Sequence, residues 1–154
     1  MSFENDIKVL AANRKARFNY SVQESIECGI ELKGTEVKSM RGSRFSFSDS
    51  YAKIDNNELW LIGFHISAYP FGNRFNHDPD RPRKLLVHKQ ELKRLKRKVD
   101  EKGLTLVPLK FYLKRGLVKL EIGVCKGKKL FDKRNDIKRR DQKRDAEREF
   151  KNRF

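Results

Sequence analysis

The sequence of 154 residues lacks the features of a secreted or membrane-spanning protein. Its two cysteines, Cys28 and Cys125, lie far apart without the spacing of a metal site. This is typical of a reduced cytoplasmic protein in which each cysteine is a small buried core residue. No stretch approaches the roughly 18 apolar residues that a membrane span requires, and the N-terminus lacks the apolar segment and cleavage site of a secretory signal. We therefore expect a cytoplasmic protein that does not span a membrane.

The sequence also lacks the common signatures of catalysis. It has no glycine-rich phosphate loop of the Walker type and no nucleophile elbow. Its three histidines show no metal-ligand spacing with one another or with a cysteine. His77 stands beside Asp78, where it is either a general base or, as is more common, a turn histidine. The sequence thus favours a binding protein over an enzyme, with no metal and no cofactor.

Positive charge is what the sequence has in excess. Lys and Arg number 37 against 21 Asp and Glu, a net charge of +16 in a length that suits one domain. A chain of this length buries roughly two-thirds of its unfolded surface and can hold a real core. A surface this basic attracts polyanions, so nucleic acid is the first candidate partner and an anionic membrane the second. A membrane-surface protein needs a strongly amphipathic helix, and the apolar face of the C-terminal segment is too narrow for one, so we expect no membrane partner.

The C-terminal residues 126–154, here called the tail, differ from the rest of the chain. They contain 13 basic and 6 acidic residues, and their apolar side chains are too few to offset the entropy of ordering the chain. Yet the tail has no proline and carries acid-to-base pairs at helical spacing, such as Asp136 with Arg140. We predict a tail that is disordered when free and helical on a phosphate-rich partner. The alternative is a solvated tail that only aids solubility.

The body of the chain before the tail indicates a mainly β fold. Apolar and polar residues alternate with the strand period of two in residues 18–22, 26–32, 107–113 and 118–124. An Asp-Asn-Asn turn at residues 55–57 joins two further predicted strands. Short strands at hairpin spacing predict a small antiparallel β-barrel.

Two helices are expected within this body. Leu92, Leu95 and Val99 form an apolar stripe at helical spacing, and Gly103 stands at the position of a C-terminal cap. The stripe predicts packing on the barrel. The other positions of this helix are mainly Lys and Arg, a face that is either solvated or in contact with RNA. A shorter helix is expected between Gly34 and Gly42.

Four segments of the chain share their order and register with a known family. They are NRKARFNY, GIELKGTEVKSMRGSRFSFSDSYAKI, PDRPRKLLVHKQELKRL and VKLEIGVCKGKKLFDKRNDIKRR. They resemble the SsrA-binding protein family, SmpB, from Asn13 to the end of the chain. The resemblance implies a barrel of the oligonucleotide-binding type over residues 13–125, with flanking helices. The order of the preceding N-terminal segment, residues 1–12, stays open.

The resemblance also implies a partner set. The family binds the tRNA-like domain of transfer-messenger RNA and, with elongation factor EF-Tu, delivers it to stalled ribosomes in trans-translation. The tail enters the decoding centre and the empty mRNA channel of the small subunit, so it senses a stall by steric exclusion. A steric mimic inside a ribosome is most simply a monomer. The residues implied in the tail are Gly127, Lys128, Lys129, Asp132, Lys133, Arg134, Lys138, Arg139 and Arg140.

RNA binding is implied for residues of the barrel domain, residues 13–125. By similarity to the family, Glu27, Leu86 and Lys119 support binding of transfer-messenger RNA. Glu27 either accepts a hydrogen bond from a base or a 2′-hydroxyl, or holds a basic neighbour in place. Phe18 stands where the family often has His, and it either stacks on a base or packs in the core. The full predicted set is Arg14, Lys15, Arg17, Phe18, Glu27, Lys38, Arg83, Lys84, Leu86 and Lys119.

Two other classes of function stay open at this point. A generic ribosomal or RNA-chaperone barrel would share the charge and the fold without preferring a tRNA-like shape. An RNA-processing nuclease would need a metal ion or a general base and would cleave RNA in Mg²⁺.

Overall fold

The computed structural model describes residues 7–71, 76–128 and 130–152. In chain order the elements are β1 (Ile7–Ala12), α1 (Arg14–Asn19), β2 (Tyr20–Ile30), α2 (Gly34–Arg41), β3 (Phe45–Ser46), β4 (Tyr51–Asp55), β5 (Glu58–Ile62), β6 (His65–Ile66), β7 (Arg83–Leu86), α3 (Lys89–Lys102), β8 (Thr105–Lys114), β9 (Leu117–Gly127) and α4 (Leu130–Asn152).

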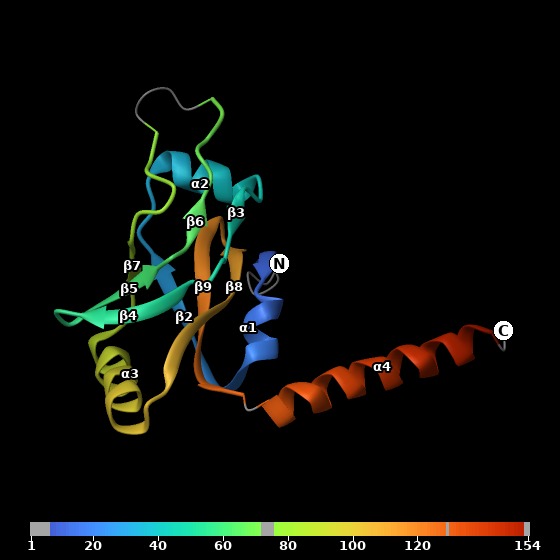
Figure 1. Ribbon diagram of the computed structural model, residues 1–154. Coiled ribbons are helices and arrows are strands. Elements are labelled where there is room, and N and C mark those ends of the chain that lie inside the picture. Colours follow the sequence, from blue (N-terminus) through green and yellow to red (C-terminus); the bar gives the residue numbers. More distant parts are fainter. Residues whose placement is uncertain (1–6, 72–75, 129, 153–154) are drawn as a thin grey trace.

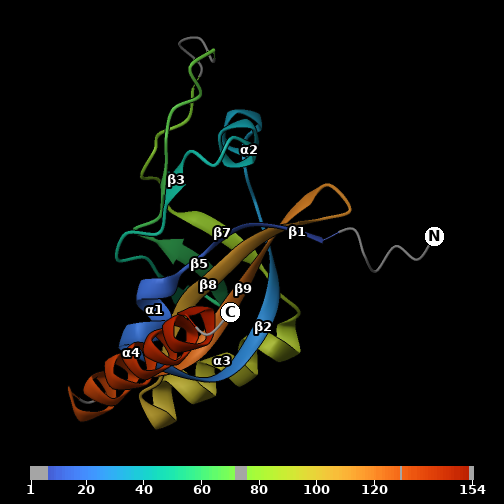
Figure 2. The same ribbon diagram turned by 90° about the vertical axis from the view of Figure 1, so that its right-hand side faces the viewer.

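The main sheet closes into a barrel. Its strands follow the order β1-β8-β4-β5-β7-β2-β9, and β8 also pairs with β9, so that six of them form a ring with β1 added along β8. Every pairing is antiparallel, and the β4–β8 side rests on the single pair Ala52 and Leu106. Helices α2 and α3 lie at opposite ends of the barrel (Figures 1 and 2). The predicted antiparallel barrel with flanking helices is confirmed.

The barrel interior is apolar and closely packed. Leu61, Leu120 and Ile122 are fully buried, and the rings of Phe64 and Phe111 stack with centroids 4.7 Å apart. Burial of such side chains is the main favourable term in folding. Cys28 and Cys125 are also buried and free, as the sequence predicts.

Helix α3 closes the lower end of the barrel with its predicted stripe. Leu95 is fully buried, and Leu92 and Val99 pack against the same core. Gly103 takes the left-handed conformation, with a φ of 63°, and its N–H bonds the carbonyl of Val99 at 3.1 Å. A residue without a Cβ adopts this conformation at no steric cost, so the helix ends where the sequence predicts.

The N-terminal part of the fold differs from the expectation. Strand β1 pairs with β8, from Ile7 opposite Lys114 to Ala12 opposite Lys110, so the main sheet includes residues before position 13. Residues 14–19 form a helix, so Phe18, predicted to begin a strand, lies in a helix and the strand begins at Tyr20. The buried Asn13 explains this change, because its side-chain oxygen accepts from the Ala16 N–H at 3.1 Å and caps the helix.

A tight contact in the barrel wall gives a first prediction. A Cβ added to Gly123 would stand 2.8 Å from Leu109 Cδ1 and 2.9 Å from Cys125 Sγ, and both neighbours are fully buried. We expect Gly123→Ala to lower the free energy of unfolding by about 1–3 kcal/mol through overpacking. Chemical denaturation measures this change. Gly34→Ala is the matched control, because a Cβ there meets nothing within 4 Å. Equal stability of the two variants would contradict the close contact of Gly123 with Leu109 and Cys125.

The tail leaves the barrel as one long helix. Helix α4 starts beside α1 and projects away from the barrel (Figure 1), and the side chains of residues 137–148 are exposed. This is the helical form predicted for the bound tail, and disorder of the free tail stays a prediction. In the part of the chain that the structure describes, no helix has the length and apolarity of a membrane span.

Candidate nucleic-acid interface

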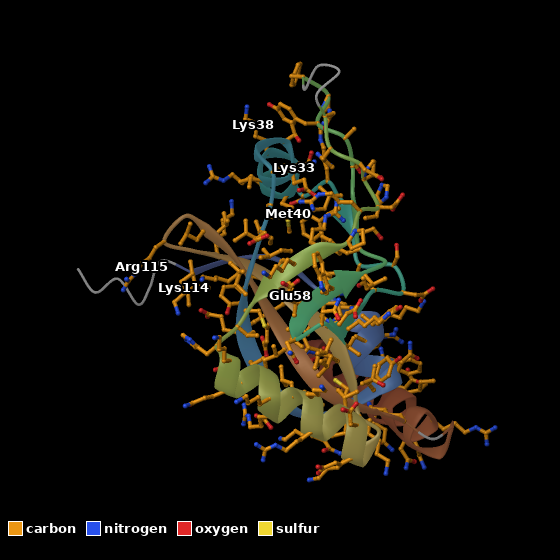
Figure 3. The ribbon with its side chains drawn as sticks, turned by 90° about the vertical axis from the view of Figure 1, so that its left-hand side faces the viewer. Lys33, Lys38, Met40, Glu58, Lys114 and Arg115 are labelled. Carbon is orange, nitrogen blue, oxygen red and sulfur yellow. The ribbon has the colours of Figure 1, made fainter. Side chains whose placement is uncertain are left out.

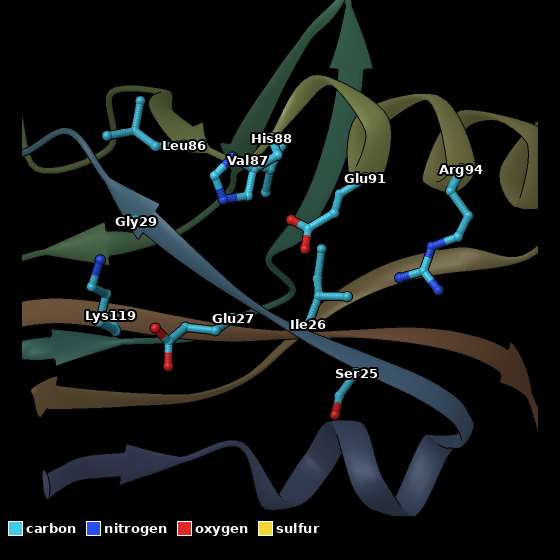
Figure 4. A pocket seen from close by; sticks show the side chains of 10 residues that line it. All are labelled: Ser25, Ile26, Glu27, Gly29, Leu86, Val87, His88, Glu91, Arg94 and Lys119. Atoms are coloured by element: carbon cyan, nitrogen blue, oxygen red, sulfur yellow. The ribbon is translucent and has the colours of Figure 1, made fainter. Parts of the chain in front are cut away.

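Three residues that the sequence analysis groups together meet in one open pocket of about 720 Å³. Glu27 comes from β2, Leu86 from the end of β7 and Lys119 from β9, while His88, Glu91 and Arg94 add the N-terminal part of α3 (Figure 4). Residues from four separate elements thus share one surface, here called the β2 pocket.

The register of the sheet explains this meeting. Gly29 of β2 lies opposite Leu86 on one side and opposite Lys119 on the other. Leu86, Gly29 and Lys119 therefore form one row across three neighbouring strands. A Cβ on Gly29 would stand 3.2 Å from Leu86 Cβ, so the missing side chain leaves room for the leucine. Leu86 is 47% exposed and offers an apolar surface beside the cation of Lys119.

The carboxylate of Glu27 is held in place and charged. Tyr112 donates its hydroxyl to Glu27 at 2.5 Å, and the Lys114 ammonium lies 3.4 Å away. The hydrogen bond from Tyr112 lowers the pKa of Glu27 below its ordinary value, with further help from Lys114 and Lys119. Burial and the bond to Glu27 raise the pKa of Tyr112, which keeps its proton as the donor. An ionised carboxylate can only accept, so Glu27 suits a base amino group or a 2′-hydroxyl.

The rim of the β2 pocket continues onto the basic helix α3. Arg94 and Lys98 both form ion pairs with Glu24 of β2, which fixes this side of the helix to the sheet. The other basic side chains of α3 are exposed: Lys89, Lys93, Lys96, Arg97 and Lys102. Whether these side chains contact RNA or only solvent stays open.

A second cationic surface lies between α1 and α4, here called the tail groove. It encloses about 430 Å³, and its lining residues are Arg14, Arg17, Phe18, Lys128, Arg139 and Arg140. The Arg140 guanidinium stands 5.1 Å from the centre of the Phe18 ring, a cation–π distance. Phe18 is half-buried in a helix, so it does not fill the barrel core. Five cations around one ring can hold phosphates beside a base.

The other tail residues lie along the exposed helix or outside the description. Gly127 ends β9, and the Lys128 N–H bonds the Asn19 carbonyl at 2.9 Å, which anchors the start of the tail to α1. Arg134 and Lys138 are exposed on α4. Lys129 lies outside the described residues, and of Asp132 and Lys133 the structure describes the helical backbone alone.

Three predicted contacts lie apart from both surfaces. Lys15 forms an ion pair with Asp49 at 3.0 Å and does not line the tail groove. Lys84 reaches Glu58 at 3.4 Å on the barrel wall. Lys38 is exposed on α2, at the opposite end of the barrel from α3.

The structure corrects the role of Arg83. Its side chain is 0% exposed, and its guanidinium bonds the Glu36 carboxylate at 2.7 Å and the Phe64 carbonyl at 2.5 Å. A third bond, at 3.0 Å, goes to the carbonyl of Pro79. A cation enclosed in this way cannot touch RNA, so Arg83 supports the fold instead.

Sequence reasoning missed some residues of the β2 pocket. Tyr112, which fixes Glu27, stands between Lys110 and Lys114 in an alternating strand, a position that suggested an outward side chain. Arg94 was one of many cations in its helix. Among the described residues, no three His, Cys, Asp or Glu side chains gather closely enough to hold a metal ion.

Comparison with known proteins points to one family. The family described as "SmpB protein" matches residues 10–152. The SsrA-binding protein of Treponema denticola is 63% identical over 145 residues, which are 94% of each chain. That of Borreliella burgdorferi is 52% identical over 147 residues, 96% of this chain and 98% of the other. One solved structure, "tmRNA-SmpB: a journey to the center of the bacterial ribosome", superposes with a TM-score of 0.65 at 50% identity, covering 78% of this chain and 85% of that one.

Proposed function

Because the chain belongs to the SmpB protein family, we propose that it binds transfer-messenger RNA and brings it to stalled ribosomes for trans-translation. The observation that carries this function is the meeting of Glu27, Leu86 and Lys119 in the β2 pocket. These are the positions that match the family's RNA-binding residues, and the fold brings them together from three strands.

The β2 pocket binds the tRNA-like domain of that RNA. Lys119 and Arg94 attract phosphates, and the charged Glu27 accepts one or two hydrogen bonds from a base or a sugar. Leu86 adds an apolar contact that shapes the surface. The Glu27 carboxylate, between Lys119 and Arg94, repels a misplaced phosphate. The pocket therefore selects RNA by the arrangement of its phosphates and hydrogen-bond donors and not by negative charge alone.

The tail acts on the ribosome. Its exposed Arg134, Lys138 and Arg139 face solvent along α4, ready for the phosphates of ribosomal RNA. The helix enters the decoding centre and the mRNA channel of the small subunit when no mRNA fills that channel. The stall is thus sensed by steric exclusion.

This work requires no catalysis by the protein. SmpB is an RNA-binding family, and the chain acts in it as a binding protein without cofactor. We propose that it works as a monomer in the cytoplasm, in a delivery complex with EF-Tu. The tail groove at the junction of barrel and tail then orients α4 relative to the bound RNA.

A binding titration across salt tests this function. The full chain is titrated against the tRNA-like domain, an elongator tRNA and an unrelated hairpin. If about six phosphates are engaged, nonspecific affinity falls about 10³-fold between roughly 50 and 200 mM salt. We expect the preference for the tRNA-like domain to survive high salt, since hydrogen bonds and shape are screened less than charge.

The opposite result has a clear meaning. If all three RNAs weaken together and become indistinguishable, the chain is a generic basic RNA binder, and the proposed function fails. Cleavage of any of these RNAs in Mg²⁺ would instead show a nuclease.

A further inference from the structure

One aromatic side chain at the far end of the molecule has no packing role. Phe71 is 81% exposed, the most exposed large apolar side chain of the described residues. Its ring meets Tyr69 edge to face at 5.6 Å, and the Lys38 ammonium of α2 stands 5.4 Å from the Tyr69 ring centre. A lone exposed ring is ordinary, but a ring paired with a second ring and a cation is a typical surface for nucleobases.

The backbone beneath these rings is tied down. Residues 67–82, here called the crossover loop, join β6 to β7. The Asn76 side chain donates to the Tyr69 carbonyl at 2.7 Å and accepts from the Tyr69 N–H at 3.2 Å, in the manner of a strand pair. The buried His77 bonds Thr35 of α2 at 2.8 Å and the Ile66 carbonyl at 2.9 Å. The two arms of the loop are therefore joined to each other and to α2.

A buried ion cluster also holds the crossover loop to α2. The Glu36 carboxylate of α2 accepts from Arg81 of the loop and from Arg83, the first residue of β7. Arg83 also donates to the carbonyl of Phe64, just before β6, and to that of Pro79 in the loop. The described parts of the loop, residues 67–71 and 76–82, are thus held to each other and to α2 in advance of any partner, which lowers the entropy cost of binding.

The surroundings of the rings are cationic. Exposed basic side chains follow α2 and the turn after it: Lys33, Lys38, Arg41 and Arg44. Figure 3 shows Lys33 and Lys38 on α2, at the end of the molecule that carries the crossover loop. The acidic residue of this helix, Glu36, is buried and neutralised by two arginines, so α2 itself presents positive charge, whereas the exposed Asp78 and Asp80 lie on the second arm of the loop.

This surface is continuous with the β2 pocket. Gly29 lies opposite Leu86 at the pocket, and two residues further the Glu31 N–H still bonds the Lys84 carbonyl at 2.9 Å. Lys33 then caps α2, four residues and about 13 Å of extended chain from Gly29. The part-exposed Lys84 lies along this path. One RNA can therefore contact both places.

We propose that Phe71, supported by Tyr69 and Lys38, is a second contact for the same transfer-messenger RNA, and that it stacks on one unpaired base of the tRNA-like domain. Lys38 neutralises the phosphate next to that base. The inference rests on the proposed function, since it extends the RNA contact of the β2 pocket. Ring stacking suits an unpaired base, whereas an acidic protein would need cations alone.

Photocrosslinking of the full chain tests this contact. A benzophenone amino acid replaces Phe71 in one variant and Leu86 in another, and each is irradiated with the tRNA-like domain. We expect crosslinks from both positions, at different nucleotides. In parallel, Phe71→Ala should weaken binding roughly 5- to 150-fold, Phe71→Leu nearly as much, and Phe71→Trp little, because stacking needs an aromatic face. Leu117→Ala removes an exposed apolar side chain elsewhere and should bind normally.

The outcomes separate the two claims. Crosslinks from position 86 but none from position 71, with Phe71→Ala binding like the unmodified chain, overturn the inference and leave the proposed function intact. If neither position crosslinks, the proposed function itself fails.

Discussion

Deletion of residues 127–154 is expected to abolish peptide tagging on stalled ribosomes, while the shortened chain still binds the tRNA-like domain. The deletion removes 12 basic and 6 acidic side chains, including Lys128, Arg139 and Arg140 of the tail groove, but leaves the β2 pocket complete. Helix α4 projects away from the barrel, and its charges are screened over about 8 Å at physiological salt. We therefore expect the β2 pocket to keep its preference for the tRNA-like domain, with a partial loss of affinity from the three tail-groove cations that are removed.

Two assays on the same variant check this division of roles. A reconstituted translation system with a truncated message reports tagging, and a direct titration reports RNA affinity. The matched control is a chain whose tail carries the same residues in shuffled order, which keeps composition and net charge. If the shuffled tail supports tagging, charge alone suffices and the steric sensor is wrong. Equal loss of tagging and RNA binding would refute separate roles.

Replacement of Glu36 should cause the largest loss of stability of any single change considered. Its buried carboxylate is shared by Arg81 and Arg83 and also accepts from the Lys33 N–H at 2.8 Å. Glu36→Gln leaves two guanidinium groups without their counter-charge, one of them fully buried. Breaking such a cluster costs about 3–5 kcal/mol, which lowers the melting temperature of a chain this size by about 6 to 20 °C.

The same residue sets a dependence on pH. Burial acts to raise the pKa of Glu36, but hydrogen bonds from Arg81, the Lys33 backbone and Arg83 outweigh it, so the pKa lies below its ordinary value. A lowered pKa in the folded state stabilises above the unfolded value of about 4.3, and the contribution disappears as pH falls through the folded value. The unmodified chain should therefore lose more stability in acid than Glu36→Gln does.

Thermal melts at several pH values measure both effects. Glu58→Gln is the control, because Glu58 makes a part-exposed pair with Lys84 and should change stability by less than about 1 kcal/mol. If Glu36→Gln melts like the control at neutral pH, the arginines have other partners and the cluster is not essential. If the melting temperatures of Glu36→Gln and the unmodified chain changed with pH in parallel, the Glu36 carboxylate would not be ionised as assigned.

The regular parts of the fold could be predicted because their signals are local. The stripe of α3 and its Gly103 cap repeat at helical spacing, and the β8–β9 hairpin alternates with the strand period. The end of helix α1, at Phe18, was predicted as strand, because Phe18, Tyr20 and Val22 alternate and a six-residue helix is too short to show its own period. Asn13, a good N-cap, was the available signal.

The candidate site was predictable in its members but not in its geometry. The resemblance supplied Glu27, Leu86 and Lys119, and their meeting depends on a register that is set by the whole barrel. Arg83 was assigned to RNA because a guanidinium in a proline-rich segment suits the oxygens of a phosphate. Its true partner, Glu36, is 47 residues away in the chain, and no local pattern reveals a contact of that kind.

The reactivity of the two buried cysteines reports transient opening of the folded chain. Burial raises the pKa of Cys28 to about 12 and that of Cys125 to about 11, so neither forms a thiolate at neutral pH while the barrel is closed. Alkylating reagents attack the thiolate, and they reach each sulfur only after the packing around it opens, which is the barrel core for Cys28 and the cluster with Ala16 and Leu109 for Cys125. The rate at which the unmodified chain is alkylated therefore measures how often these regions open, and no engineered label is needed.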